Sequence, residues 1–294
     1  MNHQDRAQGS VIGLAVGDAI GTTLEFSKRD SYDHLTDMVG GGPFDLAIGE
    51  WTDDTSMALC LGHSLLCNHR LSESDLLNRF YRWYTQGYMS SNGVCFDIGI
   101  TTVEALNEWA STGSVVNCRN SSQSGNGSIM RLSPAVVAHH SNRACALDVA
   151  VRQSMTTHSS CECLSSVELL THYLFDLYQG HDRLQHRDHW SPKVQAVANQ
   201  DYETLSRDLV SSSGYVVHTL EASIWCVHHS QSFEQAVLMA ANLGNDSDTV
   251  AAVTGQIAGA KWGASAIPKK WVDRLSHCDI IVDMAQKLYQ KGVQ

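Results

Sequence analysis

The sequence has little proline, few basic residues and no long hydrophobic run. Only 4 of its 294 residues are proline, which excludes a proline-rich linker or a polyproline protein. No uninterrupted apolar stretch approaches the roughly 18 residues that a membrane-spanning helix needs, so no transmembrane segment is expected. Lysine and arginine number 20 against 31 aspartates and glutamates, which gives a net charge of −11. This charge argues against a nucleic-acid or anionic-membrane partner, because both attract basic proteins.

Neither the N-terminus nor the cysteines indicate an exported protein. The apolar stretch 11–20 imitates the core of a signal peptide, but Asp18 interrupts it and glycines recur through it, so no secretory signal is expected. The nine cysteines include no C-x-x-C pair, which gives no support for a zinc ribbon or a thioredoxin-like motif. Most of them stand among apolar residues and are predicted to be small buried side chains. A reducing cytoplasm is the expected location.

Helical periodicity dominates the hydrophobic pattern. In 57–65 and 76–84, apolar residues recur three, four and seven positions apart, the spacing of one face of an α-helix. Ser72 precedes the second stretch with Asp75 three positions later, which predicts a helix N-cap. Alternation with a period of two is almost absent, so we predict an all-α protein. Further helices are predicted over 96–109, 129–139, 144–155, 161–178, 215–227, 233–241, 249–262 and 280–289.

Two of the expected helices carry stripes of glycine. Glycine recurs every fourth residue between positions 9 and 21, and again at 255 and 259. Because glycine in a helix interior costs about 1 kcal/mol relative to alanine, the stripes indicate backbones that approach closely. Small residues tolerated in a tight bundle are the alternative. No linker divides the chain, so residues 1–294 are predicted to form a single domain in which the polar stretch 179–200 is a loop.

Two acidic clusters stand directly ahead of predicted helices. Capping would explain either cluster alone, since aspartate and threonine are preferred N-caps and acids favour the positive end of a helix. An EF-hand is excluded for the second cluster, because apolar residues follow where that loop needs more oxygen ligands. In an extended stretch, Asp246 and Asp248 would point the same way. The clusters are Trp51-Thr52-Asp53-Asp54-Thr55, before a helix expected near Ser56, and Asn245-Asp246-Ser247-Asp248-Thr249.

Together the two clusters supply hard oxygen ligands and no histidine or cysteine. Such a set favours Mg²⁺, Mn²⁺ or Ca²⁺ over zinc or copper. Four carboxylates gathered in one cleft would repel one another, and two divalent cations would balance their charge. If the clusters meet, the sequence therefore predicts a binuclear metal centre. The predicted ligands are Thr52, Asp53, Asp54, Asp246, Asp248 and Thr249.

Four segments, in family order, resemble the ADP-ribosylglycohydrolases, in the branch that contains the dinitrogenase reductase-activating glycohydrolase and the animal ADP-ribosylhydrolases. Four spaced motifs are specific where one alone would be weak. The resemblance implies a compact orthogonal multi-helix fold with two Mg²⁺ or Mn²⁺ ions at the base of a cleft. It also implies removal of ADP-ribose from a modified side chain by hydrolysis at the ribose C1″. The segments are GLAVGDAIG (13–21), WTDDT (51–55), GNGSIMR (125–131) and GNDSDT (244–249).

The resemblance also implies roles for residues around the substrate. His158 matches a histidine near the phosphates and the terminal ribose, and Tyr215 matches an aromatic residue near the modified side chain in arginine-specific relatives. A helix expected to start near Ile129 would add its positive end to a loop that holds the diphosphate. The open alternatives are a merely flexible glycine loop, a structural histidine and a buried aromatic side chain. The loop residues are Gly125, Asn126, Gly127 and Ser128.

The catalytic residues that the resemblance implies are Asp97, Glu25 and Asp54. Asp97 matches an acid close to the scissile bond, although a helix cap would also explain it. Glu25 matches a loop glutamate that reaches the metal site in some members. Either acid could act as the base in a metal-assisted hydrolysis.

The expected activity is hydrolysis of ADP-ribosyl-arginine on a protein. Hydrolysis of ADP-ribosyl-serine or O-acetyl-ADP-ribose, and a non-catalytic ADP-ribose-binding relative, stay open. Immunity against an ADP-ribosylating toxin would use the same chemistry. The expected partners are an ADP-ribosylated protein and ADP-ribose, with no nucleic acid and no membrane, and the chain is expected to be a monomer.

Overall fold

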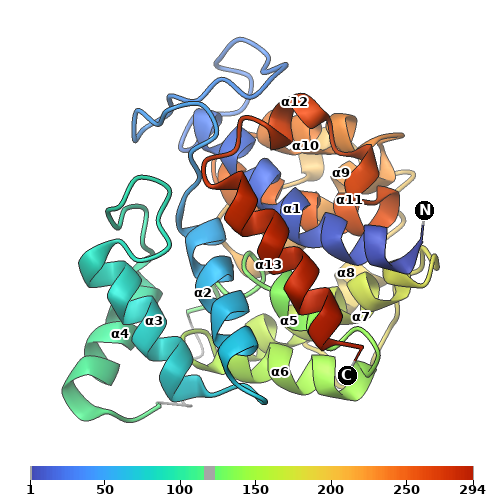
Figure 1. Ribbon diagram of the computed structural model, residues 1–294. Helices are drawn as coiled ribbons and strands as arrows, with labels where there is room; N and C mark the ends of the chain where they lie inside the picture. The colour runs from blue at the N-terminus through green and yellow to red at the C-terminus, as the bar shows by residue number, and fades with distance from the viewer. Residues whose placement is uncertain (1, 116–122, 294) are drawn as a thin grey trace.

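The computed structural model describes residues 2–115 and 123–293 (Figure 1). Across these residues the chain is helical, and β-structure is limited to isolated bridges, which confirms the all-α prediction. The α-helices are α1 (His3–Gly21), α2 (Asp53–Cys67), α3 (Glu73–Gln86), α4 (Ile100–Thr112), α5 (Ser133–Val137), α6 (Arg143–Met155), α7 (Cys161–Tyr178), α8 (Pro192–Ala198), α9 (Val216–His228), α10 (Phe233–Ala241), α11 (Ser247–Trp262), α12 (Lys269–Val272) and α13 (Cys278–Lys291). Short 3₁₀ helices are η1 (Thr22–Leu24), η2 (Arg207–Leu209) and η3 (Ala264–Ala266).

Helices α1 and α11 lie side by side at the centre of the molecule and pack antiparallel (Figure 1). Both are buried along most of their length, so neither has a polar face. A Cβ added to Gly9 would lie 2.4 Å from the carbonyl oxygen of Gly259, and one added to Gly21 would lie 2.3 Å from that of Ser247. No methyl group fits at these distances, which confirms that the glycine stripes bring two backbones together. The pairing sets the first turn of α11 against the C-terminal end of α1.

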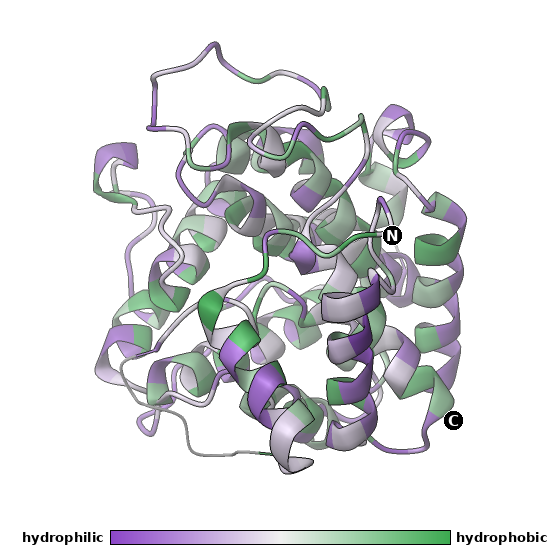
Figure 2. Cartoon of the chain, turned by 90° about the vertical axis from the view of Figure 1, so that its left-hand side faces the viewer, coloured by the Kyte–Doolittle hydropathy of each residue, from purple (hydrophilic) through white to green (hydrophobic). Residues whose placement is uncertain are grey.

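The remaining helices surround this pair. Helices α9 and α10 pack on α11, α13 packs on α1 and α2, and α3 covers α2 with α4 outside it. The predicted N-cap of α3 is confirmed, because the Ser72 hydroxyl accepts a hydrogen bond from the Asp75 backbone N–H. Outer helices such as α3 and α13 bury one face only. Figure 2 shows hydrophobic and hydrophilic stretches alternating along helical ribbons. On α13 the buried face is formed by Ile281, Met284, Ala285 and Leu288.

Two predicted helix starts are wrong, and both matter for the site. Helix α4 begins at Ile100 with Gly99 as its N-cap, so Asp97 lies in the preceding loop and does not cap it. The stretch 129–139 contains only the five-residue α5, and turns occupy the chain before it. No helix therefore starts near Ile129, and the predicted helix terminus behind the glycine loop is absent from this described segment.

The stretch 179–200 is not wholly a loop, because it contains α8. The Ser191 hydroxyl accepts from the backbone N–H of Val194, and Pro192 occupies the first helical position, where its missing N–H costs nothing. The prediction that most cysteines are buried is also wrong: of the described cysteines only Cys60, Cys163 and Cys226 are buried. Cys118 lies outside the described residues. Among the described helices, none combines the length and the apolar character needed to cross a membrane.

Candidate active site

The two acidic clusters meet where the N-termini of α2 and α11 converge on the end of α1. Both helices start earlier than predicted, so Asp53, Asp54 and Asp248 lie within first turns rather than ahead of them. One oxygen from each of these three carboxylates lies within 4.8 Å of the others. The Thr52 hydroxyl oxygen lies 3.2 Å from Asp248 Oδ2 across 196 positions of sequence, and the Thr249 hydroxyl donates to Asp54 Oδ1 at 3.3 Å.

Asp246 and Asp248 both reach the site, but not for the reason predicted. Asp246 is the N-cap of α11 with φ −90° and ψ 60°, so the segment is not an extended strand with two side chains on one face. Asp246 is instead held from across the cavity, because the Asn126 side-chain amide donates to its Oδ2 at 2.6 Å. Asn126 also donates to the Thr219 hydroxyl at 2.9 Å, which fixes the amide orientation.

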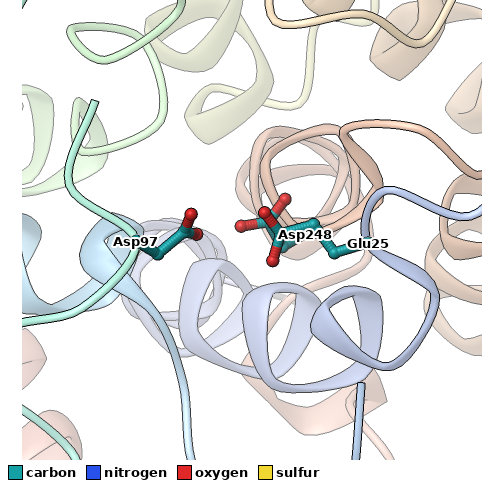
Figure 3. A group of neighbouring side chains, drawn as sticks. All are labelled: Glu25, Asp97 and Asp248. Carbon is teal, nitrogen blue, oxygen red and sulfur yellow. The ribbon is translucent and has the colours of Figure 1, made fainter. Parts of the chain in front are cut away.

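Glu25 and Asp97 form a second acidic group with Asp248. One carboxylate oxygen from each lies within 4.8 Å of the others, and Figure 3 shows Glu25 and Asp97 on opposite sides of Asp248. Glu25 follows η1, whereas Asp97 comes from the loop before α4. Asp97 has φ +57° and Phe26, next to Glu25, has φ +58°. A left-handed backbone is costly for residues other than glycine, so the surrounding contacts must hold both loops in place.

Burial and mutual repulsion disfavour negative charge throughout this group. Burial raises the pKa of Glu25 to about 10, with Asp248 and Asp246 adding repulsion. Burial likewise raises the pKa of Asp97 to about 10, with Asp53 and Glu25 adding to it. Burial and neighbouring carboxylates also raise the pKa of Asp53, Asp54 and Asp248.

Three buried carboxylate oxygens have no hydrogen-bond partner within the described part of the chain. They are Glu25 Oε2, Asp54 Oδ2 and Asp248 Oδ1. Buried carboxylates without a partner are expensive, and cations are the usual compensation. The donor set is entirely oxygen, as magnesium and manganese prefer. The residues present therefore fit a divalent-metal site.

Asp18 anchors the first turn of α2, and the sequence analysis gave it no role in the site. Its Oδ1 accepts from the backbone N–H and the hydroxyl of Thr52, both at 2.9 Å. Its Oδ2 accepts from the backbone N–H of Thr55 at 2.9 Å and from the Thr55 hydroxyl at 2.6 Å. A fully buried carboxylate thus satisfies donors that would otherwise be orphaned at a helix N-terminus. The signal in the sequence that could have revealed this role is the single acidic residue within an apolar helix that carries a glycine stripe.

Glu25, Asp53, Asp97 and Asp246 line a cavity of about 620 Å³ together with Gly125, Asn126, Gly127 and His158, whereas Asp54 and Asp248 do not line it. Phe26 and Ile100 also line the cavity, and they are 69% and 77% exposed. Neither residue belongs to a motif that the sequence displays.

Two predicted substrate-binding residues do not line this cavity. Ser128 is fully buried. The Tyr215 backbone bridges to Gly125, while its hydroxyl accepts a hydrogen bond from Lys193 Nζ at 2.9 Å. Their roles stay predictions.

The comparison with known proteins decides the family. The sequence profile described as ADP-ribosylglycohydrolase matches residues 1–294. The chain belongs to this family.

Individual relatives agree with the ADP-ribosylglycohydrolase assignment. The chain is 42% identical to "ADP-ribosylarginine hydrolase Tri1" of Pseudomonas putida (strain GB-1), over 99% of this chain and 79% of that protein. It is 44% identical to the protein of the same name from Serratia proteamaculans (strain 568), over 97% of this chain and 79% of that protein. A solved structure titled "ADP-ribosylglycohydrolase-related protein complex" superposes with a TM-score of 0.84 at 33% identity and covers 99% of both chains.

Proposed function

We propose that this ADP-ribosylglycohydrolase removes ADP-ribose from a modified arginine side chain of a protein. The observation that carries the proposal is the convergence of two acidic groups that share Asp248, Glu25 with Asp97 and Asp53 with Asp54. Glu25, Asp53 and Asp97 line a cavity that the glycine loop also lines. The two relatives named ADP-ribosylarginine hydrolase support arginine as the modified residue. The acidic cavity also suits the cationic guanidino group that would leave.

Two divalent cations, Mg²⁺ or Mn²⁺, would be held by Thr52, Asp53, Asp54, Asp246, Asp248 and Thr249. When bound, such cations neutralise the clustered carboxylates and lower the pKa of coordinated water. Support comes from the oxygen-only donor set and from the orphaned carboxylate oxygens at the site.

The chain's own groups divide the remaining work by their positions. Asp97 and Glu25 line the cavity and lie close to Asp248. Once bound cations offset the repulsion that raises their pKa, either could take a proton from the water that attacks C1″. Gly125 and Gly127 have no side chain to keep the diphosphate from their backbone N–H groups. Asn126 positions Asp246 through its amide.

The test is a panel of ADP-ribosylated arginine, ADP-ribosylated serine and O-acetyl-ADP-ribose, each with Mg²⁺ or Mn²⁺. We expect release of ADP-ribose from arginine, loss of release with a chelator, and restoration on adding metal. Asp97→Asn should abolish release while ADP-ribose still binds, which separates catalysis from binding. Release from none of the three substrates, with ADP-ribose binding intact, would refute the activity and leave a binding protein.

We also propose a cytoplasmic location and a monomeric state. Exposed cysteines such as Cys67, Cys145 and Cys161 favour a reducing cytoplasm, because exposed thiols oxidise elsewhere. A monomer is checked by light scattering of the metal-loaded protein; a stable dimer would contradict it.

A further inference from the structure

His158 lies against the glycine loop, and its ring orientation is constrained by that contact. A Cβ added to Gly127 would lie 2.6 Å from Cε1 and 3.1 Å from Nε2 of His158, and one added to Gly125 would lie 3.2 Å from Nε2. The Nε2 edge of the ring therefore faces the loop at the cavity wall. The other ring nitrogen, Nδ1, lies 2.8 Å from the Thr157 hydroxyl.

A buried arginine stands behind this histidine. Arg131 is fully buried, and its guanidinium lies over the Phe80 ring at 4.7 Å. Its Nε donates to the Gln153 side-chain oxygen at 2.8 Å. One terminal nitrogen donates to the Gln153 carbonyl at 3.1 Å and to the Thr157 hydroxyl oxygen at 2.8 Å. The guanidinium is thus fixed by neutral acceptors on two sides and by an aromatic face on a third.

The direction of these hydrogen bonds determines where the histidine proton lies. Arginine has donors only, so the Thr157 oxygen must accept from Arg131. The hydroxyl oxygen has a second lone pair, but if it also accepted from His158 its one hydrogen would be buried without an acceptor. The hydroxyl therefore donates to Nδ1 of His158, which can accept only when it carries no proton. A neutral imidazole with a bare Nδ1 carries its proton on Nε2, the nitrogen that faces the glycine loop.

We propose that Arg131 and Thr157 lock His158 into the Nε2–H tautomer, which presents a hydrogen-bond donor to the diphosphate of ADP-ribose at the glycine loop. This inference rests on the proposed function, because it takes ADP-ribose as the ligand. An Nε2–H donates to a phosphate oxygen, whereas the opposite tautomer would turn a lone pair toward the anion. Arg131 and Thr157 are positioning residues, since they act through His158.

Thr157→Val and Thr157→Ser form the matched pair that tests the relay. Valine keeps the branched shape but removes the hydroxyl, whereas serine keeps the hydroxyl. Long-range ¹H–¹⁵N NMR of the full chain reports the tautomer, with the His158 signals assigned by their loss in His158→Gln. We expect the Nε2–H signature in the wild type and in Thr157→Ser, and its loss in Thr157→Val.

The same variants are compared for binding and kinetics with Mn²⁺ present. We expect ADP-ribose affinity to fall about tenfold in Thr157→Val, the size of one lost charge-assisted hydrogen bond. The KM for ADP-ribosylated arginine should rise by a similar factor while kcat changes little, because the diphosphate lies away from the reacting carbon. Thr157→Ser should restore both values to within about twofold of the wild type.

Each outcome supports or overturns the relay. An Nδ1–H signature in the wild type overturns it without any variant, so a misfolded Thr157→Val leaves the test intact. Loss of the Nε2–H signature in Thr157→Val with unchanged ADP-ribose affinity also overturns it, because the tautomer would then not serve the diphosphate. Failure of the proposed function looks different: the wild type would keep the Nε2–H signature but release ADP-ribose from no substrate.

Discussion

Replacing Gly21 with alanine should damage the proposed metal site through the backbone of a neighbouring helix. A Cβ at Gly21 would lie 2.3 Å from the carbonyl oxygen of Ser247 and 2.6 Å from the Cα of Asp248. Ordinary contact begins at 3.4 Å, so the first turn of α11 must retreat by about 1 Å. That turn carries Asp248, which belongs to both acidic groups of the site.

The cost in stability is the balance of two effects. Alanine is a better helix former than glycine by about 1 kcal/mol, but overpacking a tight interface costs about 1–3 kcal/mol. The net loss is about 0–2 kcal/mol, which corresponds to a fall in Tm of up to roughly 3 °C for a chain of 294 residues. Gly9→Ala is the matched control, because its Cβ would lie 2.4 Å from the Gly259 carbonyl oxygen at the other end of the same helix pair.

The two variants should differ in metal binding. Ligand distances in metal sites tolerate about 0.2 Å, so a retreat of about 1 Å should weaken Mn²⁺ binding at least tenfold in Gly21→Ala. Gly259 lies about 16 Å along α11 from Asp248, so Gly9→Ala should bind Mn²⁺ like the wild type. Calorimetric titration and thermal unfolding with and without Mn²⁺ measure both effects. Equal Mn²⁺ affinity in the two variants would refute the reasoning.

Three further predictions concern single side chains. Asp18→Asn turns one of the two accepting oxygens that hold the first turn of α2 into an NH₂ group, which can only donate. Calorimetry should therefore show a 10–100-fold weaker Mn²⁺ affinity, and an unchanged affinity would exclude the anchoring role. Asp54→Asn relieves repulsion among the clustered carboxylates, so in the presence of chelator the Tm of the variant should exceed that of the wild type. The rise in Tm on adding Mn²⁺ should disappear in the variant. A lower Tm of the variant in chelator would contradict the prediction. His172 has its pKa lowered to about 4 by burial, with Arg187 and Arg143 adding to the effect. Between pH 6.5 and 4, His172 therefore binds a proton in the unfolded chain but not in the folded chain. As the pH is lowered through this range, the Tm of the wild type should fall more steeply than that of His172→Gln. Parallel curves of Tm against pH would contradict this prediction.

The sequence sufficed for features whose cause is local or periodic. The glycine stripes predicted that other backbones approach these two helices closely, because glycine in a helix interior is otherwise costly; that the two striped helices pair with each other comes from the structure. The acidic clusters predicted that carboxylates from distant segments would gather, because six oxygen donors exceed what two caps require, and those carboxylates do lie together. Both predictions depend on composition at fixed spacing, which sequence displays directly.

The features that the sequence did not reveal are set by tertiary contacts. The left-handed backbone of Asp97 is held by the loops around it, and no periodicity announces such a conformation. Asp18 gains its role only when α2 docks on α1, so an acid in an apolar helix looked merely like an interruption. Ser191 and Pro192 are ordinary signals for the start of a helix, and α8 begins there. The polar composition of 179–200 nevertheless predicts a loop, so composition and local pattern disagree in this stretch.

The antiparallel pairing at the centre of the fold also affects how the protein is made. Helix α1 leaves the ribosome before α11 and is apolar on nearly every side. Ser247 of α11, which contacts Gly21 of α1, follows 226 residues later. At translation rates of about 5–20 residues per second, α1 waits roughly 10–45 seconds for this contact. Until then the apolar surface of this helix lacks its largest native partner, and the two acidic clusters cannot meet before α11 has been synthesised.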